Sequence, residues 1–285
     1  MTSLKTLLMA ALVSTTLLPG VTIALANGNV TEVAAAATQD IRQDRAVAAL
    51  RMFRGGDKAA LEWFHLTYTE HDVTIGDGID GLRAHASVAS GVESLQVHRV
   101  FQDGDYVVLH SSDTQNASFD VFLFEGDLIV EHWQNAQALG APNPSGRTMV
   151  DGTTKITGRS TADLEANKKI LAEVGRIIAE GEPYEGLAEL YHENMVQHAS
   201  YMGDGFAALL AILGPPPAGV TSQSINHLRL ADGDFVFTAS EDRTDGKSTA
   251  YFDFFRIENG KIAEHWDTVQ KVPARSDWKN NNGKF

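Results

Sequence analysis

Residues 252–267 read Phe-Asp-Phe-Phe-Arg-Ile-Glu-Asn-Gly-Lys-Ile-Ala-Glu-His-Trp-Asp, and the chain contains a second copy of this pattern. Residues 119–134 read Phe-Asp-Val-Phe-Leu-Phe-Glu-Gly-Asp-Leu-Ile-Val-Glu-His-Trp-Gln. Each copy consists of two β-rich runs around a turn that contains Gly, which is typical of a β-hairpin. In both copies the Glu-His-Trp motif follows the Asp of the first strand at the same spacing, so the two hairpins share one register.

The repeat extends upstream of the hairpins. His98 and His227 each lie five positions before an Asp-Gly-Asp, and His71 and His198 each lie six positions before an Asp-Gly. Matched spacings at several places are the sequence signature of repeated structural units. We therefore expect two units of the same fold, with the two hairpins superposing.

Each copy begins with helices and continues with strands. Apolar residues at helical spacing predict helices over 40–54 and 163–180, each ending at Gly. Shorter helices are predicted over 58–68, 82–89, 184–191 and 206–213. Four β-rich runs separated by Gly-containing turns follow in each copy, in the first at 95–101, 106–112, 119–124 and 128–135. Helices followed by an antiparallel meander indicate an α+β fold.

Composition divides the chain into segments. Residues 1–26 contain Lys5, an uncharged run rich in Leu and Ala, and a small-x-small end, which predict a cleaved secretory signal peptide; the alternative is a membrane anchor. Residues 141–160 are dense in Gly, Pro, Ser and Thr and predict a linker. We therefore expect one domain over 38–140, a second over 161–285, and a secreted or periplasmic protein.

The overall composition excludes several classes of function. With 23 Lys and Arg against 37 Asp and Glu, the chain has a formal net charge of -14, so nucleic acid is not an expected partner. No Cys is present, which excludes disulfides, thiolate nucleophiles and cysteine-based metal sites. Any chemistry must use His, Asp, Glu, Tyr or Ser.

The repeated motifs resemble those of SnoaL-like proteins of the NTF2-like superfamily, in particular the tandem group of predicted SnoaL-like aldol-condensation proteins. The resemblance rests on the His-x5-Asp-Gly segment and the final Glu-His-Trp-Asp hairpin, and it covers both copies. It implies two cone-shaped domains, each a curved antiparallel sheet packed on helices with a pocket open at one end. It does not imply one activity, because the superfamily includes isomerases, cyclases, dehydratases and proteins without chemistry.

The chain departs from the family pattern at informative positions. Gln134 ends the Glu-His-Trp motif of the first copy, where the second copy has Asp267. An amide cannot act as a general base. In the second copy, Ala199 and Ser200 replace the Asn-Pro that the family has after its His. Because the first copy has an amide, Gln134, where the second has Asp267, any activity is expected in the second copy.

His265 and Asp267 are the best candidates for chemistry. Residues two apart in a strand share a face, so both side chains point the same way. On the concave face, a low dielectric would raise the pKa of Asp267 and let it take a proton from a carbon next to a carbonyl group. His198, Tyr191 or Tyr201 would then donate to the enolate. The alternative is a hydrogen-bonded pair on the outer face or at a domain interface.

Further residues are expected to line the pockets, either as ligand contacts or, for the acids and histidines, as paired structural groups. These are Tyr251, Asp253, Phe255, His227, His71, Asp120 and His132. Histidine spacing gives no local metal triad, and no glycine-rich phosphate loop is present, so neither a metal nor another cofactor is expected.

Two functions remain open at the level of sequence. The first is a cofactor-independent enzyme of the isomerase, cyclase or aldol type, acting on a small apolar carbonyl compound in the second domain. The second is a non-enzymatic module that binds a small ligand or pairs with another domain. Open sheets in this fold class usually pair face to face, so we expect pairing of NTF2-like domains within the chain or between copies.

Overall fold

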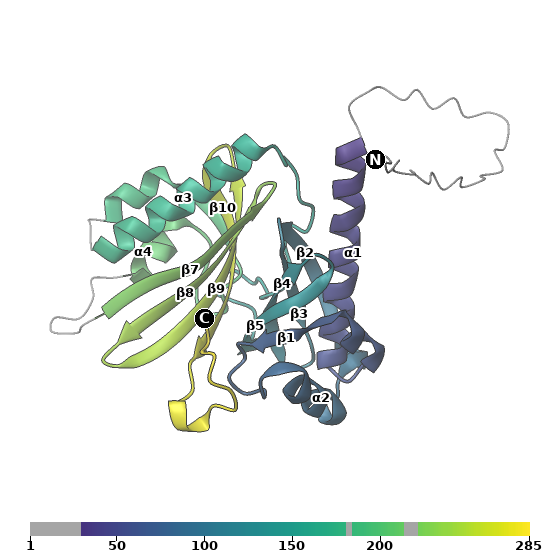
Figure 1. Ribbon diagram of the computed structural model, residues 1–285. Coiled ribbons are helices and arrows are strands. Elements are labelled where there is room, and N and C mark those ends of the chain that lie inside the picture. The colour runs from purple at the N-terminus through teal and green to yellow at the C-terminus, as the bar shows by residue number, and fades with distance from the viewer. Residues whose placement is uncertain (1–29, 181–183, 214–221) are drawn as a thin grey trace, which may run out of the picture.

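The computed structural model describes residues 30–180, 184–213 and 222–285 (Figure 1). The predicted signal peptide, residues 1–26, lies outside these ranges. None of the helices in the described ranges is long and apolar enough to cross a membrane.

The two halves of the chain have the same order of elements. In the first half these are α1 (Val30–Phe53), a 3₁₀ turn (Lys58–Trp63), β1 (Phe64–Glu70), α2 (Gly78–Val88), a 3₁₀ turn (Val92–Ser94), β2 (Gln96–Asp103), β3 (Tyr106–Ser112), β4 (Asn116–Glu125) and β5 (Leu128–Ala138). In the second half they are α3 (Thr161–Glu180), a 3₁₀ turn (Tyr184–Glu189), β6 (Tyr191–Gln197), α4 (Phe206–Leu213), β7 (Ser222–Asp232), β8 (Phe235–Thr244), β9 (Lys247–Glu258), β10 (Lys261–Lys271) and a last 3₁₀ turn (Arg275–Asp277).

Each half contains one five-stranded sheet. The strand orders are β1-β5-β4-β3-β2 and β6-β10-β9-β8-β7, which are the same order read along each half. Four strands form the predicted antiparallel meander, but β1 and β6 each pair in parallel with the last strand of their half. The predicted α+β fold is confirmed, with mixed rather than purely antiparallel sheets.

The strands β1 and β6 correct two helix predictions. Residues 58–68 and 184–191 were expected to be helical, but each contains only a short 3₁₀ turn before a strand begins. The sequence of β1, Phe-His-Leu-Thr-Tyr-Thr-Glu, is rich in aromatic and β-branched residues, which favour a strand. Its pairing partner, β5, comes about 60 residues later, so a local reading could not reveal the ladder.

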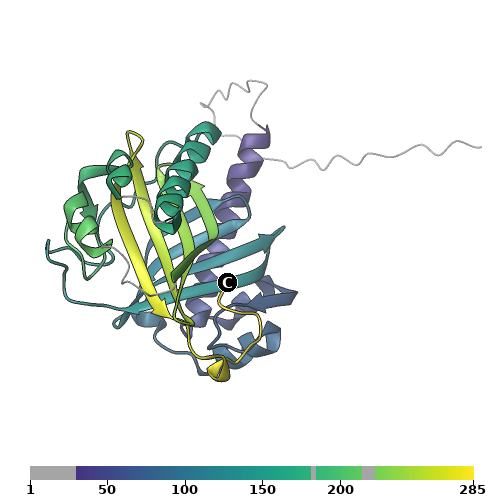
Figure 2. The same cartoon turned by 90° about the vertical axis from the view of Figure 1, so that its left-hand side faces the viewer.

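Three hydrophobic cores form among the described residues. In each half, helices cover the concave face of the sheet, and a core lies between helices and sheet: Leu50 and Phe122 belong to the first, Val174 and Phe255 to the second. A third core lies between the two sheets and includes Phe119, Phe254 and Trp266 among its members. The two sheets therefore pack face to face within one chain, with helices outside (Figure 2).

The segments that follow each sheet cross to the other half. After β5, Asn143 donates to the backbone oxygen of Gln197 in the second half. After β10, Asn282 donates to the backbone oxygen of Glu70 in the first half. Glu70 and Gln197 occupy the same position in their sheets, so the crossing is reciprocal. Residues 141–160, predicted as a linker, are thus bound to the second half, and 272–285 continue back to the first.

Candidate functional site

The candidate site lies on the face of the second sheet that is turned toward the helices. His265 pairs across the sheet with Phe255, which belongs to the core under α3, and Asp267 pairs with Asp253. Trp266, between them in sequence, belongs to the core between the two sheets. His265 and Asp267 therefore share the concave face, as their spacing predicts.

Asp267 is the most unusual side chain on this face. It is 2% exposed, and its Oδ2 accepts a hydrogen bond of 2.6 Å from the hydroxyl of Tyr201. Its Oδ1 is buried and has no partner among the described residues. Burial, together with the nearby charge of Asp253, raises the pKa of Asp267 to about 6, against the opposing effects of His265 and Tyr201.

His265 connects two neighbouring strands. Its Nδ1 donates to Oε1 of Gln197 at 2.9 Å, and its Nε2 donates to Oδ1 of Asp253 at 3.1 Å. The ring also stacks on Phe255, with 4.6 Å between centroids. Asp253 is therefore held by His265, beside Asp267.

The same three residues present a donor set that divalent cations use. Ligand atoms of Asp253, His265 and Asp267 lie within 4.8 Å of one another. Both nitrogens of His265 already have oxygen partners, however, so the ring would have to break one of these hydrogen bonds to bind a metal. This geometry favours the hydrogen-bonded arrangement, and the absence of a metal and of other cofactors stays a prediction.

His198, expected beside His265 and Asp267, lies on the opposite face of the sheet. Its ring stacks on Trp266 at 4.7 Å, its Nε2 lies 3.0 Å from Oε1 of Glu264, and its Nδ1 lies 2.6 Å from Oδ1 of Asp151. The reason is the alternation of β6, where Gln197 faces the concave side and the next residue faces away. His198 therefore does not contribute to the candidate site.

His71 repeats this arrangement in the first half. Its ring stacks on Trp133 at 4.6 Å, and its Nε2 lies 2.9 Å from Oε2 of Glu131. In both halves, the Glu and Trp of the Glu-His-Trp motif thus hold the upstream His on the face between the sheets. The expected ligand-binding role of His71 has no geometric support, and the repeated motif serves packing on that face.

The first half contains a closed counterpart of the site. His132 lies between Glu70, at 3.0 Å, and Asp120, at 3.2 Å, and all three side chains are completely buried. The two carboxylates raise the pKa of His132 to about 9 despite its burial. Gln134 donates to Asp120 at 2.8 Å. The carboxylate and the amide have thus changed places: Glu70 corresponds to Gln197, and Gln134 to Asp267.

The C-terminal segment covers this counterpart. Lys284 is 6% exposed, and its Nζ donates to the backbone oxygen of Gln134 and to Oε1 of Gln270. Asp120 and His132, predicted as ligand contacts, therefore belong to a buried charge cluster beneath this segment.

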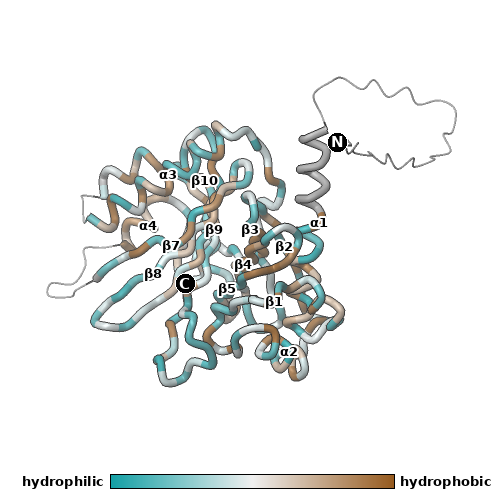
Figure 3. The backbone as a smooth tube through the Cα atoms, viewed as in Figure 1, coloured by the Kyte–Doolittle hydropathy of each residue, from teal (hydrophilic) through white to brown (hydrophobic). Residues whose placement is uncertain are grey.

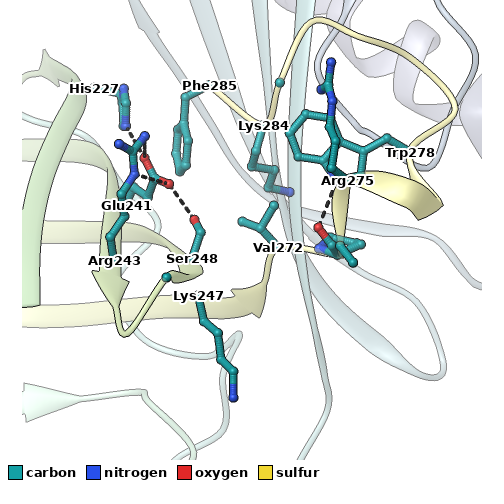
Figure 4. Close-up of a pocket in the computed structure, with 14 residues that line it drawn as sticks. His227, Glu241, Arg243, Lys247, Ser248, Val272, Arg275, Trp278, Lys284 and Phe285 are labelled. Carbon is teal, nitrogen blue, oxygen red and sulfur yellow. Dashed lines mark hydrogen bonds and ion pairs between the residues drawn. The ribbon is translucent and has the colours of Figure 1, made fainter. Parts of the chain in front are cut away.

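His227, also predicted as a ligand contact, lies outside the cone of the second half. Its Nε2 lies 3.2 Å from Oε2 of Glu241, and its ring stacks on Phe285 at 4.1 Å. It lines a separate pocket of about 530 Å³ between the β8–β9 hairpin and the C-terminal segment (Figure 4). In that view, Arg243 and Ser248 point toward Glu241, and both donate to it.

Tyr251 and Phe255 were predicted as pocket walls, and this role stays a prediction. Both lie on the concave face of β9, and Tyr251 pairs with Ser240 of β8 and with Val269 of β10. Burial raises the pKa of Tyr251, and the charges of Asp242, Asp253 and Asp267 add to this effect. The sequence reading missed Gln197 as a partner of His265, although its place before His198 carried the signal.

Comparison with known proteins finds similarity to one domain family and to several solved structures. The SnoaL-like domain family matches residues 176–265. Solved structures with similarity include a SnoaL-like polyketide cyclase from Agrobacterium tumefaciens, with 10% identity, 36% of this chain and 91% of that chain covered, and a TM-score of 0.32. An NTF-2-like protein from Burkholderia xenovorans has 17% identity, 42% and 97% coverage, and a TM-score of 0.33. An epoxide hydrolase of the LEH-like type from M. tuberculosis has 13% identity, 38% and 84% coverage, and a TM-score of 0.32.

No curated protein sequence matches this chain. The narrower assignment to the tandem aldol-condensation group therefore stays a prediction from the motifs. The match at 176–265 covers β6 to β10 up to His265, which contains most of the candidate site. Residues 176–265, in the second half of the chain, are thus similar to SnoaL-like domains.

Proposed function

We propose that the second half of the chain catalyses proton transfer on a small carbonyl compound, with Asp267 as the general base. The observation that carries the proposal is the state of this carboxylate: buried, with a pKa of about 6, and with Oδ1 free of any partner among the described residues. A base works best when its pKa lies near the working pH, and burial has brought Asp267 close to that range.

The proposed reaction uses the two oxygens of Asp267 differently. Tyr201 donates to Oδ2 and fixes the orientation of the carboxylate. Oδ1 then takes the proton from a carbon next to the carbonyl group, and the electrons of that C–H bond form an enolate. In an isomerisation, Asp267 returns the proton to a different carbon. In an aldol-type reaction, the enolate attacks a second carbonyl carbon, and the new alkoxide takes the proton.

His265 and Asp253 have a positioning role in this proposal. The hydrogen bond between them keeps Asp253 beside Asp267, which raises the pKa of Asp267, while the charge of His265 lowers it. These opposing effects limit the upward shift that burial produces. A base that stayed protonated at neutral pH would not function, so this balance is part of the proposed site.

We propose that the first half has no catalytic role. Gln134 takes the place of Asp267, and its amide donates to Asp120. The remaining charged groups are enclosed and paired around His132. The chain would then carry one active site, and its first half would serve as the packing partner of the second sheet.

Binding without chemistry is the second candidate. It is favoured by the first half, in which the same fold keeps a polar cluster on the concave face without a free base.

We also propose, from residues 1–26, that the protein is exported. Mass spectrometry of the exported protein tests this proposal, and retention of these residues would refute it.

Exchange of carbon-bound hydrogen for deuterium tests the proposed function directly. In D₂O, ¹H NMR of a panel of small ketones should show enzyme-dependent loss of the signals next to the carbonyl group. Asp267→Asn should lower this rate about 100-fold or more, the usual scale for loss of a general base. Asp120→Asn in the first half is the matched control and should leave the rate unchanged. Equal rates of exchange for the wild type and Asp267→Asn would refute Asp267 as the base and leave ligand binding without chemistry as the remaining candidate function.

A further inference from the structure

Arg229 on β7 lies in the same row of the concave face as the proposed base. Across the sheet, Arg229 pairs with Thr238, Thr238 pairs with Asp253, and Asp253 pairs with Asp267. Residues that pair directly across a sheet share one face. Ala231, two positions after Arg229, belongs to the core under α3, which confirms the direction. The row therefore runs from a guanidinium group at β7 to the carboxylate at β10.

This arginine has no counter-ion among the residues that the structure describes. Within the described ranges it makes no hydrogen bond and no ion pair, and its Nε is buried without a partner. Its Nη2 lies close to α3: the distance is 3.9 Å to the position that a Cβ atom on Gly175 would occupy. Burial lowers the pKa of Arg229. Arg229 is half-buried, and its Nε has lost contact with water without gaining a partner among the described residues, which is costly.

The first half shows that the fold does not need an arginine at this position. The corresponding row there pairs Val100 with Leu109, Leu109 with Asp120, and Asp120 with Gln134. Val100 packs against the core beneath α1. The first half thus places an apolar side chain where the second half places Arg229. The two rows also differ at their other end, where the first half has Gln134 and the second half has Asp267. The second half thus differs from the first at both ends of the same row.

The charges on the concave face of the second half are separated in space. Asp253 and Asp267 lie on β9 and β10, with His265 beside them. Asp242 lies on β8 four positions beyond Thr238, which is about 13 Å along the strand. The β8–β9 end of the sheet is hydrophilic (Figure 3). Arg229 is the cation on the β7 side of this face, and none of these carboxylates pairs with it.

We propose that Arg229 binds the carboxylate of a small organic acid inside the cone of the second half. The planar guanidinium group can hold a carboxylate through two parallel hydrogen bonds. A dianionic phosphate is less suited, because Asp253 and Asp267 lie on the same face and repel the additional charge. The inference rests on the proposed function in one respect: it names the substrate class as a carbonyl compound that also carries a carboxylate, instead of an apolar one.

Binding of levulinate, a keto acid, and of its uncharged methyl ester tests this inference. Isothermal titration with the full chain should give at least tenfold tighter binding of levulinate. Arg229→Met should remove the difference between the two compounds, and Arg229→Lys should restore part of it. Arg243→Met is the control, because Arg243 is paired with Glu241 outside the cone, and it should keep the wild-type preference.

Stability gives a second readout that does not depend on the probe. If Arg229 is kept for a ligand, Arg229→Met should be at least as stable as the wild type to urea, because a half-buried guanidinium group whose Nε has no partner among the described residues has been removed. Lower stability of this variant, or equal affinity of the wild type for the acid and the ester, would overturn the inference. The titrations are repeated with Asp267→Asn, which removes the proposed base and keeps Arg229. If the wild type prefers the carboxylate but catalyses no deuterium exchange, Asp267 is not the base and the role of Arg229 stands.

Discussion

Substitution of Asp267 by asparagine should make the protein more stable at neutral and alkaline pH. The side chain is almost completely buried, and burial raises its pKa from 3.8 to about 6. The folded state therefore binds the proton more tightly than the unfolded state. For such an acid, the folded state is favoured at low pH, and stability falls as the pH rises from the unfolded pKa through the folded one. Asparagine has the same shape and cannot ionise.

The size of the effect follows from the pKa shift. One unit corresponds to about 1.4 kcal/mol, so the shift of Asp267 corresponds to roughly 3 kcal/mol above pH 7, as an order of magnitude. At pH 4 less than about 1 kcal/mol of this cost remains, because the carboxyl group is protonated in the folded state and only partly ionised in the unfolded state. Asparagine can still accept the hydrogen bond from Tyr201 through its side-chain oxygen.

Urea unfolding of the wild type and Asp267→Asn at pH 4.5, 6 and 8, followed by circular dichroism, measures this dependence. The difference in unfolding free energy should grow with pH in favour of the variant. Asp120→Asn is the control with the opposite sign, because hydrogen bonds and nearby positive charge lower the pKa of Asp120 despite its burial. A difference for Asp267→Asn that does not change with pH would show that this carboxyl group is not perturbed, and the assignment of the base would fail.

Three further predictions concern groups around the two clusters. Tyr201→Phe removes a hydrogen bond that lowers the pKa of Asp267, so the midpoint of the pH–rate profile for deuterium exchange should move upward; an unchanged midpoint would contradict the contact. His132→Leu leaves two buried carboxylates without their cation and should cost about 3–5 kcal/mol in urea unfolding at pH 7, and an effect below 1 kcal/mol would refute the ion cluster. Burial lowers the pKa of Lys284 from 10.5 to about 8, so the wild type should gain stability between pH 8 and 10; Lys284→Met should lack this gain, measured as the shift of the urea midpoint.

Features that depend on near neighbours in the chain could be predicted from the sequence. The repeated hairpin predicted two units of one α+β fold, and the alternation of a strand placed His265 and Asp267 on one face. The exchange of Gln134 for Asp267 already separated the two halves chemically. These conclusions follow from periodicity and from turn residues, which act within a few positions.

The tertiary structure decided which of these residues meet. His198 faces away from Asp267 because β6 pairs in parallel with β10, about 70 positions later, in a register that presents Gln197 instead. Arg229 joins the row of Asp267 only through the pairings of four strands. The crossing of the C-terminal segment to the first half likewise has no local signal. Such contacts are set by the packing of whole sheets, in which the pairing register is fixed by which faces can be buried and not by the residues next to them in the chain.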